Sequence, residues 1–297
     1  MRVAIAGAGG FLGSALTRAL VADGVAVARL VRRATRSADE IAWDPVAATL
    51  DHDALADFAP DAVVHLGGSP VMTRWTRRAM RRIRNSRVGS TRVLVDALAA
   101  LPRPPRRFLC ASAVGWYGSR PDPVDESAPP DPGFLGETCR LWEAEAFRAA
   151  GFGARVATLR LGVVLDPAGG MLGRLLPLFR LGLGARLAGG RHHVSWIALC
   201  DAVAAIRFLL SRDLQGPVDL TTDDFPTQAE WTRAVARRLR RPAPWSIPRP
   251  VLAAAFGRPA LEFLLQDVRA RPAVLTAAGF RWEHPTLAGF LAAALPR

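Results

Sequence analysis

The chain of 297 residues contains no lysine and a single tyrosine, Tyr117. The missing lysine excludes any catalytic pair of a tyrosine and a lysine. The formal net charge of +13 comes from arginine alone. Because this all-arginine set accompanies abundant alanine, we interpret the charge as a compositional bias and not as a nucleic-acid footprint, although arginine also serves phosphate recognition well.

Cysteines and long apolar runs are also scarce. The three cysteines, Cys110, Cys139 and Cys200, are widely spaced and odd in number, which is typical of reduced thiols and predicts no metal site. No apolar run is long enough to span a bilayer. The first apolar run is already a strand, so it leaves no separate leader segment. We therefore expect a cytoplasmic protein with no membrane partner.

Glycine is concentrated near the beginning of the chain, between a predicted strand and a predicted helix. The apolar run Met1–Ala6 has the length of a strand, and apolar residues recur at helical spacing over Ser14–Ala22. Between them, Gly7–Gly13 has the pattern G-x-x-G-x-x-G. Strand, glycine loop and helix follow one another in the order that a dinucleotide site needs.

Each residue of this loop has a defined part in such a site. Gly7 permits the tight turn, Gly10 lets the backbone approach a pyrophosphate, and Gly13 lets the helix close onto the strand. Phe11 and Leu12 complete the predicted cofactor site at the helix N-terminus, where free N–H groups and a partial positive charge favour phosphates. A plain glycine turn is the alternative.

The second predicted strand, Val25–Val31, is followed by Arg32 and Arg33. In an NAD site an acidic residue near this point binds the ribose hydroxyls. Two arginines in its place suit the 2′-phosphate of NADP, so we predict NADP(H) as the cofactor. Ordinary surface arginines are the alternative. Trp43 and Asp44, which end a short third strand, are candidates for flanking the adenine, or else a packed tryptophan and a capping aspartate.

Strands and helices alternate along the chain, which predicts a doubly wound parallel sheet in an α/β protein. Further strands are predicted at residues 62–68, 107–112 and 155–164, and further helices at 75–100, 135–150, 201–210 and 227–240. The helix at 201–210 is expected to be capped near Asp201. We expect residues 1–165 to form the cofactor domain, with 191–222 returning to it. Residues 166–190 and 223–297 would form a substrate-side region, of which 248–297 is a small, mainly helical C-terminal domain. A proline-rich linker is predicted at 241–250.

The strand predicted at residues 62–68 ends in Leu66, Gly67 and Gly68. Glycines at the carboxyl end of a strand allow the backbone to approach a ligand closely, so these residues join the predicted cofactor site. His65 lies inside the same strand, and a buried structural histidine is the expected interpretation.

Arginines crowd the predicted helix at residues 75–100. A solvated face is the default for such a run. Nucleic-acid binding through this helix is the lesser alternative, because no aromatic residues that stack on bases are interleaved. Within the run, Arg87 is a candidate for binding a cofactor phosphate, with a structural ion pair as the alternative.

Several separated motifs resemble the extended short-chain dehydrogenase/reductase superfamily, and in particular its epimerase-like branch, which ends in a small C-terminal domain of unknown function. The matching segments are Gly7–Gly13, Leu66–Gly68, Ser86–Arg87, Ser112–Gly118, Cys139–Glu143, Arg160–Leu165, Ser195–Ile197 and Ala278–Phe280. The resemblance covers nearly the whole chain. It implies a Rossmann fold, an NADP-type cofactor and a substrate pocket built largely by the C-terminal third.

The wider superfamily moves a proton with a Tyr-x-x-x-Lys pair, in which the lysine lowers the pKa of the tyrosine. The resemblance places Leu135 at the tyrosine position and Cys139 at the lysine position. The narrower branch is similar to this sequence in carrying Cys-x-x-Trp-Glu there. The missing pair is therefore a property of the branch and not of this chain alone.

Three residues remain as catalytic candidates. Ser112 resembles the serine that hydrogen-bonds the substrate oxygen in the superfamily, and a strand-end hydroxyl that caps a loop is the alternative. Tyr117 is the only phenol, and either lines the pocket, donates a proton or is simply packed. Cys139 offers a thiol with a reference pKa of about 8.5, or is a small buried hydrophobe.

Substrate contacts are predicted at Arg160, His192, Ser195 and Trp196. Arg160 is a candidate for binding an anion, with a structural salt bridge as the alternative. His192 could act as an acid or base near neutral pH, although the related branch usually has glutamine there.

The residues together predict an NADP(H)-dependent oxidoreductase or epimerase-like enzyme for a small hydroxyl or carbonyl substrate, with a nucleotide sugar among the candidates. The alternative is an NADP(H)-binding sensor or scaffold without turnover. We expect a small-molecule substrate, no nucleic acid and, as the partner, a second copy of the chain in a homodimer.

Overall fold

The structure is a computed structural model that describes residues 1–295. Its centre is a sheet of eight strands in the order β11-β7-β6-β5-β1-β2-β3-β4. The strands are β1 (Arg2–Ala6), β2 (Ala26–Val31), β3 (Glu40–Asp44), β4 (Thr49–Leu50), β5 (Ala62–His65), β6 (Arg107–Ala113), β7 (Arg155–Leu161) and β11 (Gly216–Leu220). All neighbours are parallel except β3 and β4. The predicted Rossmann-type fold class is confirmed.

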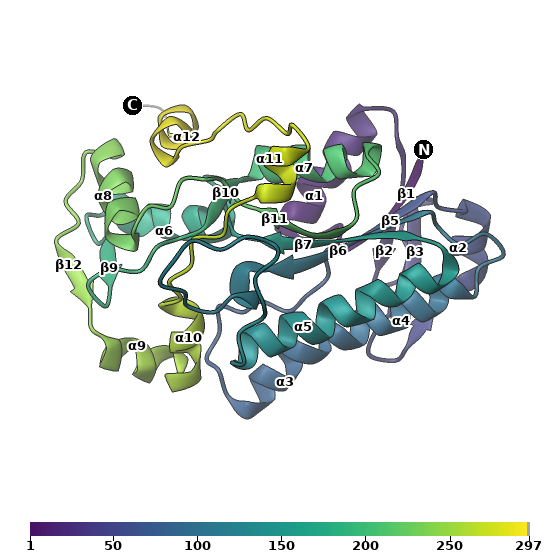
Figure 1. Ribbon diagram of the computed structural model, residues 1–297, viewed down its shortest axis with the longest axis horizontal. Coiled ribbons are helices and arrows are strands. Elements are labelled where there is room, and N and C mark those ends of the chain that lie inside the picture. The colour runs from purple at the N-terminus through teal and green to yellow at the C-terminus, as the bar shows by residue number, and fades with distance from the viewer. Residues whose placement is uncertain (296–297) are drawn as a thin grey trace.

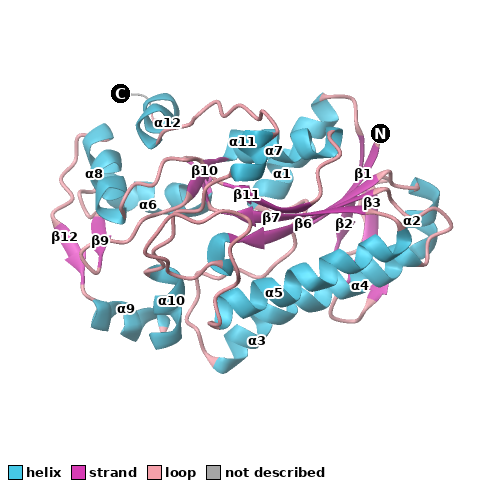
Figure 2. Ribbon diagram, in the orientation of Figure 1, coloured by secondary structure: helices cyan, strands magenta, loops and turns pink. Residues whose placement is uncertain are grey.

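Helices cover both faces of this sheet (Figures 1 and 2). On one face lie α1 (Phe11–Ala22), α7 (Leu199–Ser211) and α11 (Ala273–Ala277), and on the other lie α2 (His52–Phe58), α4 (Val88–Ala99) and α5 (Phe134–Phe147). Alternate residues of β1 serve the two layers: Val3 and Ile5 pack with α1 and α7, whereas Ala4 and Ala6 pack with α4 and α5. Burial on both faces explains why β1 is a continuous apolar run.

The order of strands reverses between β1 and β5. From β1 the chain proceeds outward through β2 and β3, and from β5 it proceeds in the opposite direction through β6 and β7. Ala6 at the end of β1 pairs with His65 at the end of β5, so the two glycine loops that follow these strands are adjacent. In sheets of this type, ligands bind in the crevice outside the carboxyl ends at such a reversal.

A second, smaller region holds a separate core. Two short parallel pairs, β8 (Val163–Asp166) with β10 (Trp196–Ala198) and β9 (Ala185–Leu187) with β12 (Trp245–Ile247), lie outside the main sheet. The helices of this region are α6 (Gly170–Arg180), α8 (Gln228–Arg238), α9 (Arg249–Phe256), α10 (Leu261–Leu264) and α12 (Leu287–Ala294). Large apolar side chains such as Trp196, Trp231 and Phe290 form this core.

Three predicted elements are corrected. The strand predicted at 155–164 ends at Leu161, and after Gly162 the chain leaves the main sheet as β8, which pairs with β10. A side chain at Gly162 would lie 2.8 Å from the carbonyl oxygen of Ser195, so only glycine fits at this point. The helix predicted at 75–100 is two helices, α3 (Arg77–Asn85) and α4. The segment predicted as a linker at 241–250 contains β12.

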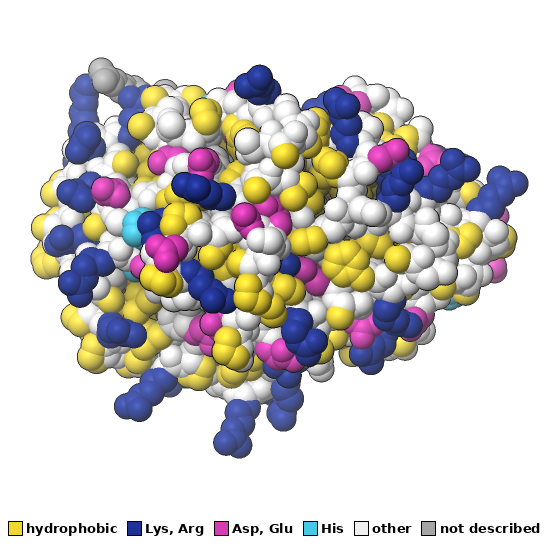
Figure 3. Space-filling view, in the orientation of Figure 1, with side chains coloured by type: hydrophobic (Ala, Val, Ile, Leu, Met, Phe, Trp, Pro, Cys, Tyr) yellow, Lys and Arg dark blue, Asp and Glu magenta, His cyan; other side chains and the backbone are white. Residues whose placement is uncertain are grey.

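The surface shows no single basic zone on the face drawn in Figure 3, where arginine side chains are scattered among acidic and apolar ones. Across residues 1–295, no helix combines the length and the apolar character needed to cross a membrane.

Candidate functional site

The turn between β1 and α1 has no room for side chains at its key glycines. Gly7 has a φ of +88° and its α-carbon lies so close to β5 that a β-carbon there would be 2.8 Å from the carbonyl carbon of Leu66. A β-carbon on Gly13 would be 2.1 Å from the carbonyl oxygen of Gly7, and one on Gly10 would be 3.2 Å from it. A side chain at any of these positions would come too close to backbone atoms, so each position holds a glycine. The backbone itself therefore forms the surface of the crevice.

The first turn of α1 offers its N–H groups to that crevice. Gly10 is the N-cap, and no side chain caps the helix or places an acidic group in its first turn. The ring of Phe11 braces the turn, because it packs where side chains on Gly169 and Gly170 would otherwise lie. Leu12 is buried in the core beneath. An uncapped helix N-terminus of this kind is suited to bind phosphate.

A pocket of about 410 Å³ lies beside the end of β2. Its lining includes Arg32, Arg33, Trp43 and Asp44. The guanidinium of Arg33 is already paired with Glu40, through hydrogen bonds of 2.8 and 2.5 Å. Arg32 is exposed, so it is the arginine of the two that is available to a ligand in this pocket.

Trp43 and Asp44 also have protein partners. The Trp43 ring is 6% exposed and meets His65 edge-on at 5.9 Å between ring centroids. The Asp44 carboxylate accepts hydrogen bonds from the N–H groups of Val46 and Ala47. Of the alternatives stated for these two residues, Trp43 is therefore the packed tryptophan and Asp44 the capping aspartate. Both residues line the pocket beside β2.

Arg87 stands at the break between α3 and α4, opposite the second glycine loop. Its guanidinium donates to the carbonyl oxygens of Ser69 and Ile83, both at 3.1 Å, and lies where a side chain on Gly68 would be. Burial lowers the pKa of Arg87, and no carboxylate in residues 1–295 forms an ion pair with it. A cation held in the crevice without a counter-ion favours an anionic ligand there.

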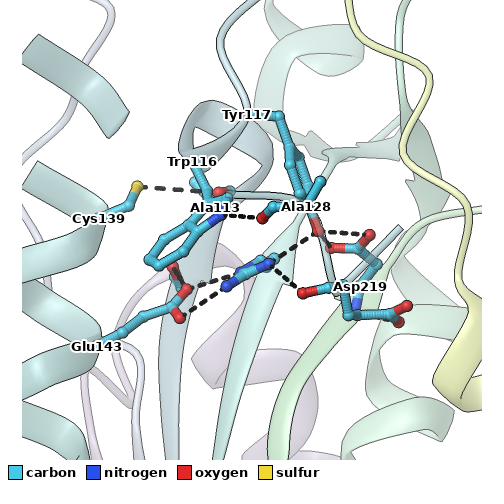
Figure 4. A network of polar contacts seen from close by, with 10 residues as sticks. Ala113, Trp116, Tyr117, Ala128, Cys139, Glu143 and Asp219 are labelled. Atoms are coloured by element: carbon cyan, nitrogen blue, oxygen red, sulfur yellow. Dashed lines mark hydrogen bonds and ion pairs between the residues drawn. The ribbon is translucent and has the colours of Figure 1, made fainter. Parts of the chain in front are cut away.

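Further along the same edge, a buried polar network that includes Glu143, Tyr117 and Asp219 crosses three strands (Figure 4). The predicted Ser112 belongs to this network through its hydrogen bond to Glu143. Ser112 on β6 pairs with Arg160 on β7, and Arg160 pairs with Asp219 on β11. Glu143 reaches this row from α5. It accepts hydrogen bonds from Ser112 Oγ at 2.6 Å and from Arg160 at 2.9 and 3.1 Å.

Tyr117 closes the other end of this network. Its hydroxyl donates to the Asp219 carboxylate at 2.9 Å and accepts from Arg160 at 3.0 Å. The side chain is fully buried, and burial raises the pKa of Tyr117, with the nearby Asp219 adding to the shift. Burial also raises the pKa of Asp219, to which Glu126 contributes. This placement favours the packed tyrosine among the alternatives and gives its hydroxyl no free direction toward a substrate.

Arg160 and Cys139 are likewise enclosed. Arg160 is 2% exposed, is paired with Glu143 and lies over the Trp116 ring at 3.8 Å, so it forms the structural salt bridge and not the predicted substrate contact. Cys139 is 3% exposed, and burial, with the charge of Glu143, raises the pKa of its thiol to about 12. A buried thiol with so high a pKa is a poor nucleophile at neutral pH.

The residues predicted to contact substrate near 195 instead dock the C-terminal domain. Ser195 Oγ donates to the carbonyl oxygen of Val268 at 2.8 Å and accepts from the N–H of Ala270 at 3.0 Å. Trp196 is fully buried in the core of the smaller region. Only His192 is partly accessible, and burial lowers the pKa of His192.

Two members of the network, Glu143 and Asp219, were not predicted from the sequence as functional candidates. Glu143 lies within a matched motif, and its spacing of four residues from Cys139 indicates the same helix face. That spacing was the available signal. Asp219 had none, because only the pairing of β11 with β7 brings it beside Arg160.

Sequence comparison gives matches along nearly the whole chain. The sequence model described as the NAD dependent epimerase/dehydratase family matches residues 3–219, and a domain of unknown function, DUF1731, matches residues 247–294. Among curated relatives, Epimerase family protein Mb2239 from Mycobacterium bovis is 44% identical over 298 residues, covering 99% of this chain and 98% of the relative.

Solved structures show the same architecture. The crystal structure of human epimerase family protein SDR39U1 (isoform 2) with NADPH has a TM-score of 0.89 and 30% identity, and 99% of each chain is covered. A nucleoside-diphosphate sugar epimerase from Corynebacterium glutamicum has a TM-score of 0.79 and 29% identity, covering 99% of this chain and 58% of that one.

Proposed function

This chain belongs to the NAD-dependent epimerase/dehydratase family, and from that premise we propose that it is an NADP(H)-dependent oxidoreductase or epimerase-like enzyme. Its substrate would be a small molecule with a hydroxyl or carbonyl group, with nucleotide sugars as the first class to test. The observation that carries the proposal is the glycine turn at Gly7–Gly13, whose backbone leaves no room for side chains and faces the crevice at the strand reversal.

The residues around the crevice fit an NADP-type cofactor. The turn and the first N–H groups of α1 would hold the pyrophosphate, and Arg32 would bind the 2′-phosphate because Arg33 is committed to Glu40. Arg87, which lacks a counter-ion, would stabilise negative charge at the second glycine loop. When bound, the nicotinamide supplies hydride chemistry to the substrate.

Ser112 and Glu143 would handle the proton. Because Ser112 Oγ donates its hydrogen to Glu143, its lone pairs are left to accept a hydrogen bond. In the oxidation direction, Ser112 Oγ would accept the proton of a substrate hydroxyl while its own hydrogen passes to Glu143 Oε1. Arg160 keeps the carboxylate in place through two hydrogen bonds. Ser112 and Glu143 are 2% and 3% exposed, so bulk water is kept from the pair.

A second candidate function is an NADP(H)-binding sensor without turnover. It is favoured by the burial of Leu135 and Cys139 where the superfamily has its tyrosine and lysine, and by the protein partners that already occupy the hydroxyls of Ser112 and Tyr117. Both candidates share the cofactor site, so cofactor binding and turnover are tested separately.

Cofactor binding is tested by isothermal titration calorimetry with NADPH and NADH. Hydrogen bonds to charged groups contribute about 1.5–3 kcal/mol each. Arg32→Ala is therefore expected to weaken NADPH binding by about 10- to 100-fold and to leave the affinity for NADH unchanged. Arg33→Ala is the matched control, because its guanidinium is engaged by Glu40. Equal affinity of the wild type for both cofactors, or no binding at millimolar concentration, would contradict the cofactor assignment.

Turnover is tested by following the loss of label from stereospecifically labelled NADPH in the presence of a panel of nucleotide sugars and simpler alcohols and carbonyls. Ser112→Ala is expected to abolish exchange with little change in NADPH affinity. Thr158→Val is the control, since Thr158 carries a buried hydroxyl on β7 that has no hydrogen-bond partner within residues 1–295. Binding of NADPH with no exchange across the whole panel would support the sensor instead.

A further inference from the structure

A cluster of three metal-binding side chains lies away from the cofactor crevice, where α7 begins. We propose that Cys200, Glu283 and His284 form a site for one zinc-class divalent cation. Their ligand atoms, the thiol sulfur, a carboxylate oxygen and an imidazole nitrogen, all lie within 4.8 Å of one another. The Nε2 atom of His284 and Oε1 of Glu283 are 3.8 Å apart. The three side chains come from two segments more than eighty residues apart in the chain.

The buried carboxylate of Asp201 places the two segments against each other. It accepts hydrogen bonds from the N–H groups of Glu283 at 2.7 Å and His284 at 3.0 Å, and it is 1% exposed. Because Asp201 follows Cys200 directly on α7, this contact fixes the backbone of the two ligands beside the thiol. Asp201 was predicted to cap its own helix, but Ala198 is the N-cap and Asp201 holds the C-terminal segment instead.

The side chains themselves have suitable freedom. The His284 ring is held edge-on by Phe290 at 5.6 Å between centroids and its side chain is 17% exposed. The Glu283 side chain is 72% exposed, and Cys200 is also at the surface. Ligand atoms of a tetrahedral zinc ion are about 3.5 Å apart, and the 3.8 Å between Glu283 Oε1 and His284 Nε2 is already close to that spacing.

The donor set selects the class of metal. Thiolate, imidazole and carboxylate are the three donor types that zinc takes in proteins, whereas magnesium and calcium take oxygen atoms. Three protein ligands leave a fourth position for water. A bound ion would join α7 of the cofactor domain to the segment before α12, and would therefore stabilise the docking of the C-terminal domain.

The proposal is tested by titrating the chelator-treated full-length protein with Co²⁺, which reports thiolate ligation through a charge-transfer band in the near ultraviolet. We expect this band to saturate at one ion per chain and to be displaced by Zn²⁺. Cys200→Ala is expected to remove the band, and His284→Gln and Glu283→Gln to weaken cobalt binding. Zn²⁺ is expected to raise the melting temperature of the wild type and not that of Cys200→Ala.

Two controls separate this site from incidental binding. Cys110→Ala removes a buried cysteine and His52→Ala removes an exposed histidine, and both variants should keep the cobalt band. Cobalt binding without a thiolate band, a band that survives Cys200→Ala, or no band at millimolar Co²⁺ would overturn the proposal. Since Cys200 and Glu283 are at the surface, circular dichroism is expected to show that their variants fold.

Discussion

His65, beneath the second glycine loop, makes the stability of the protein depend on pH in a specific window. Its ring is fully buried, Nε2 lies 3.1 Å from Ser90 Oγ, and Nδ1 has no hydrogen-bond partner among the residues that the structure describes. Ser90 Oγ donates its hydrogen to the carbonyl oxygen of Ser86. The Nε2–H of His65 therefore donates to Ser90 Oγ, and Nδ1 carries the lone pair. Protonation at Nδ1 would create a buried imidazolium cation whose Nδ1–H group faces no hydrogen-bond acceptor in residues 1–295.

Burial, followed by the nearby charge of Arg87, lowers the pKa of His65 to about 4. In the unfolded chain the reference pKa of histidine is about 6.5. The unfolded state therefore binds more protons between these values, so stability is complete above pH 6.5 and falls as the pH decreases toward 4. At about 1.4 kcal/mol per pKa unit, the free energy of unfolding falls by about 3 kcal/mol in total, and about 2 kcal/mol of this has been lost by pH 5.

The measurement is urea unfolding of the wild type and of His65→Asn at pH 8, 6 and 5. Other groups titrate alike in the two proteins, so the difference between their free energies of unfolding isolates His65. We expect His65→Asn to be the less stable at pH 8 and the difference to shrink by about 2 kcal/mol at pH 5. A difference that stays constant within about 0.5 kcal/mol would refute the reasoning.

Three further predictions concern the crevice and the docking of the C-terminal domain. Gly13→Ala is expected to weaken NADPH binding and to destabilise the fold by about 1–3 kcal/mol through overpacking, whereas Gly9→Ala, which has open space, should change neither in the same titrations. Arg87→Gln is expected to weaken NADPH binding in calorimetry, because it removes a cation for which residues 1–295 supply no counter-ion; it also removes hydrogen bonds to the Ser69 and Ile83 carbonyls, so a lower melting temperature with unchanged NADPH affinity would argue for a purely structural role. Ser195→Ala leaves the Val268 carbonyl and Ala270 N–H without partners and should lower the free energy of unfolding in urea by about 2 kcal/mol; no loss would mean that these contacts do not dock the domain.

The features that the sequence determined by itself are local in the chain. Side chains at Gly10 and Gly13 would meet the Gly7 carbonyl, at most six positions away, so this part of the glycine spacing is visible without a fold. The close approach of Leu66 to Gly7 comes from the assembled sheet. The fold class follows from the alternation of apolar runs with helical periodicity, because each run must bury both faces. The missing lysine excludes the usual catalytic pair whatever the fold.

The roles of the polar residues were decided by tertiary structure. Arg32 and Arg33 are equivalent in sequence, and only the pairing of β2 with β3 gives Glu40 to one of them. Ser112, Tyr117 and Arg160 were predicted as site residues, but each has a buried carboxylate as its partner: Glu143 from α5 for Ser112 and Arg160, and Asp219 from β11 for Tyr117.

The three cysteines were predicted to form no metal site because their spacing shows no motif. Cys200 gains two candidate co-ligands only because the Asp201 carboxylate holds residues 283 and 284 against α7. Hydrogen bonds and ion pairs between distant segments form only where the packing of the core brings the two backbones close together. Their partners are therefore set by the assembled fold and not by spacing along the chain.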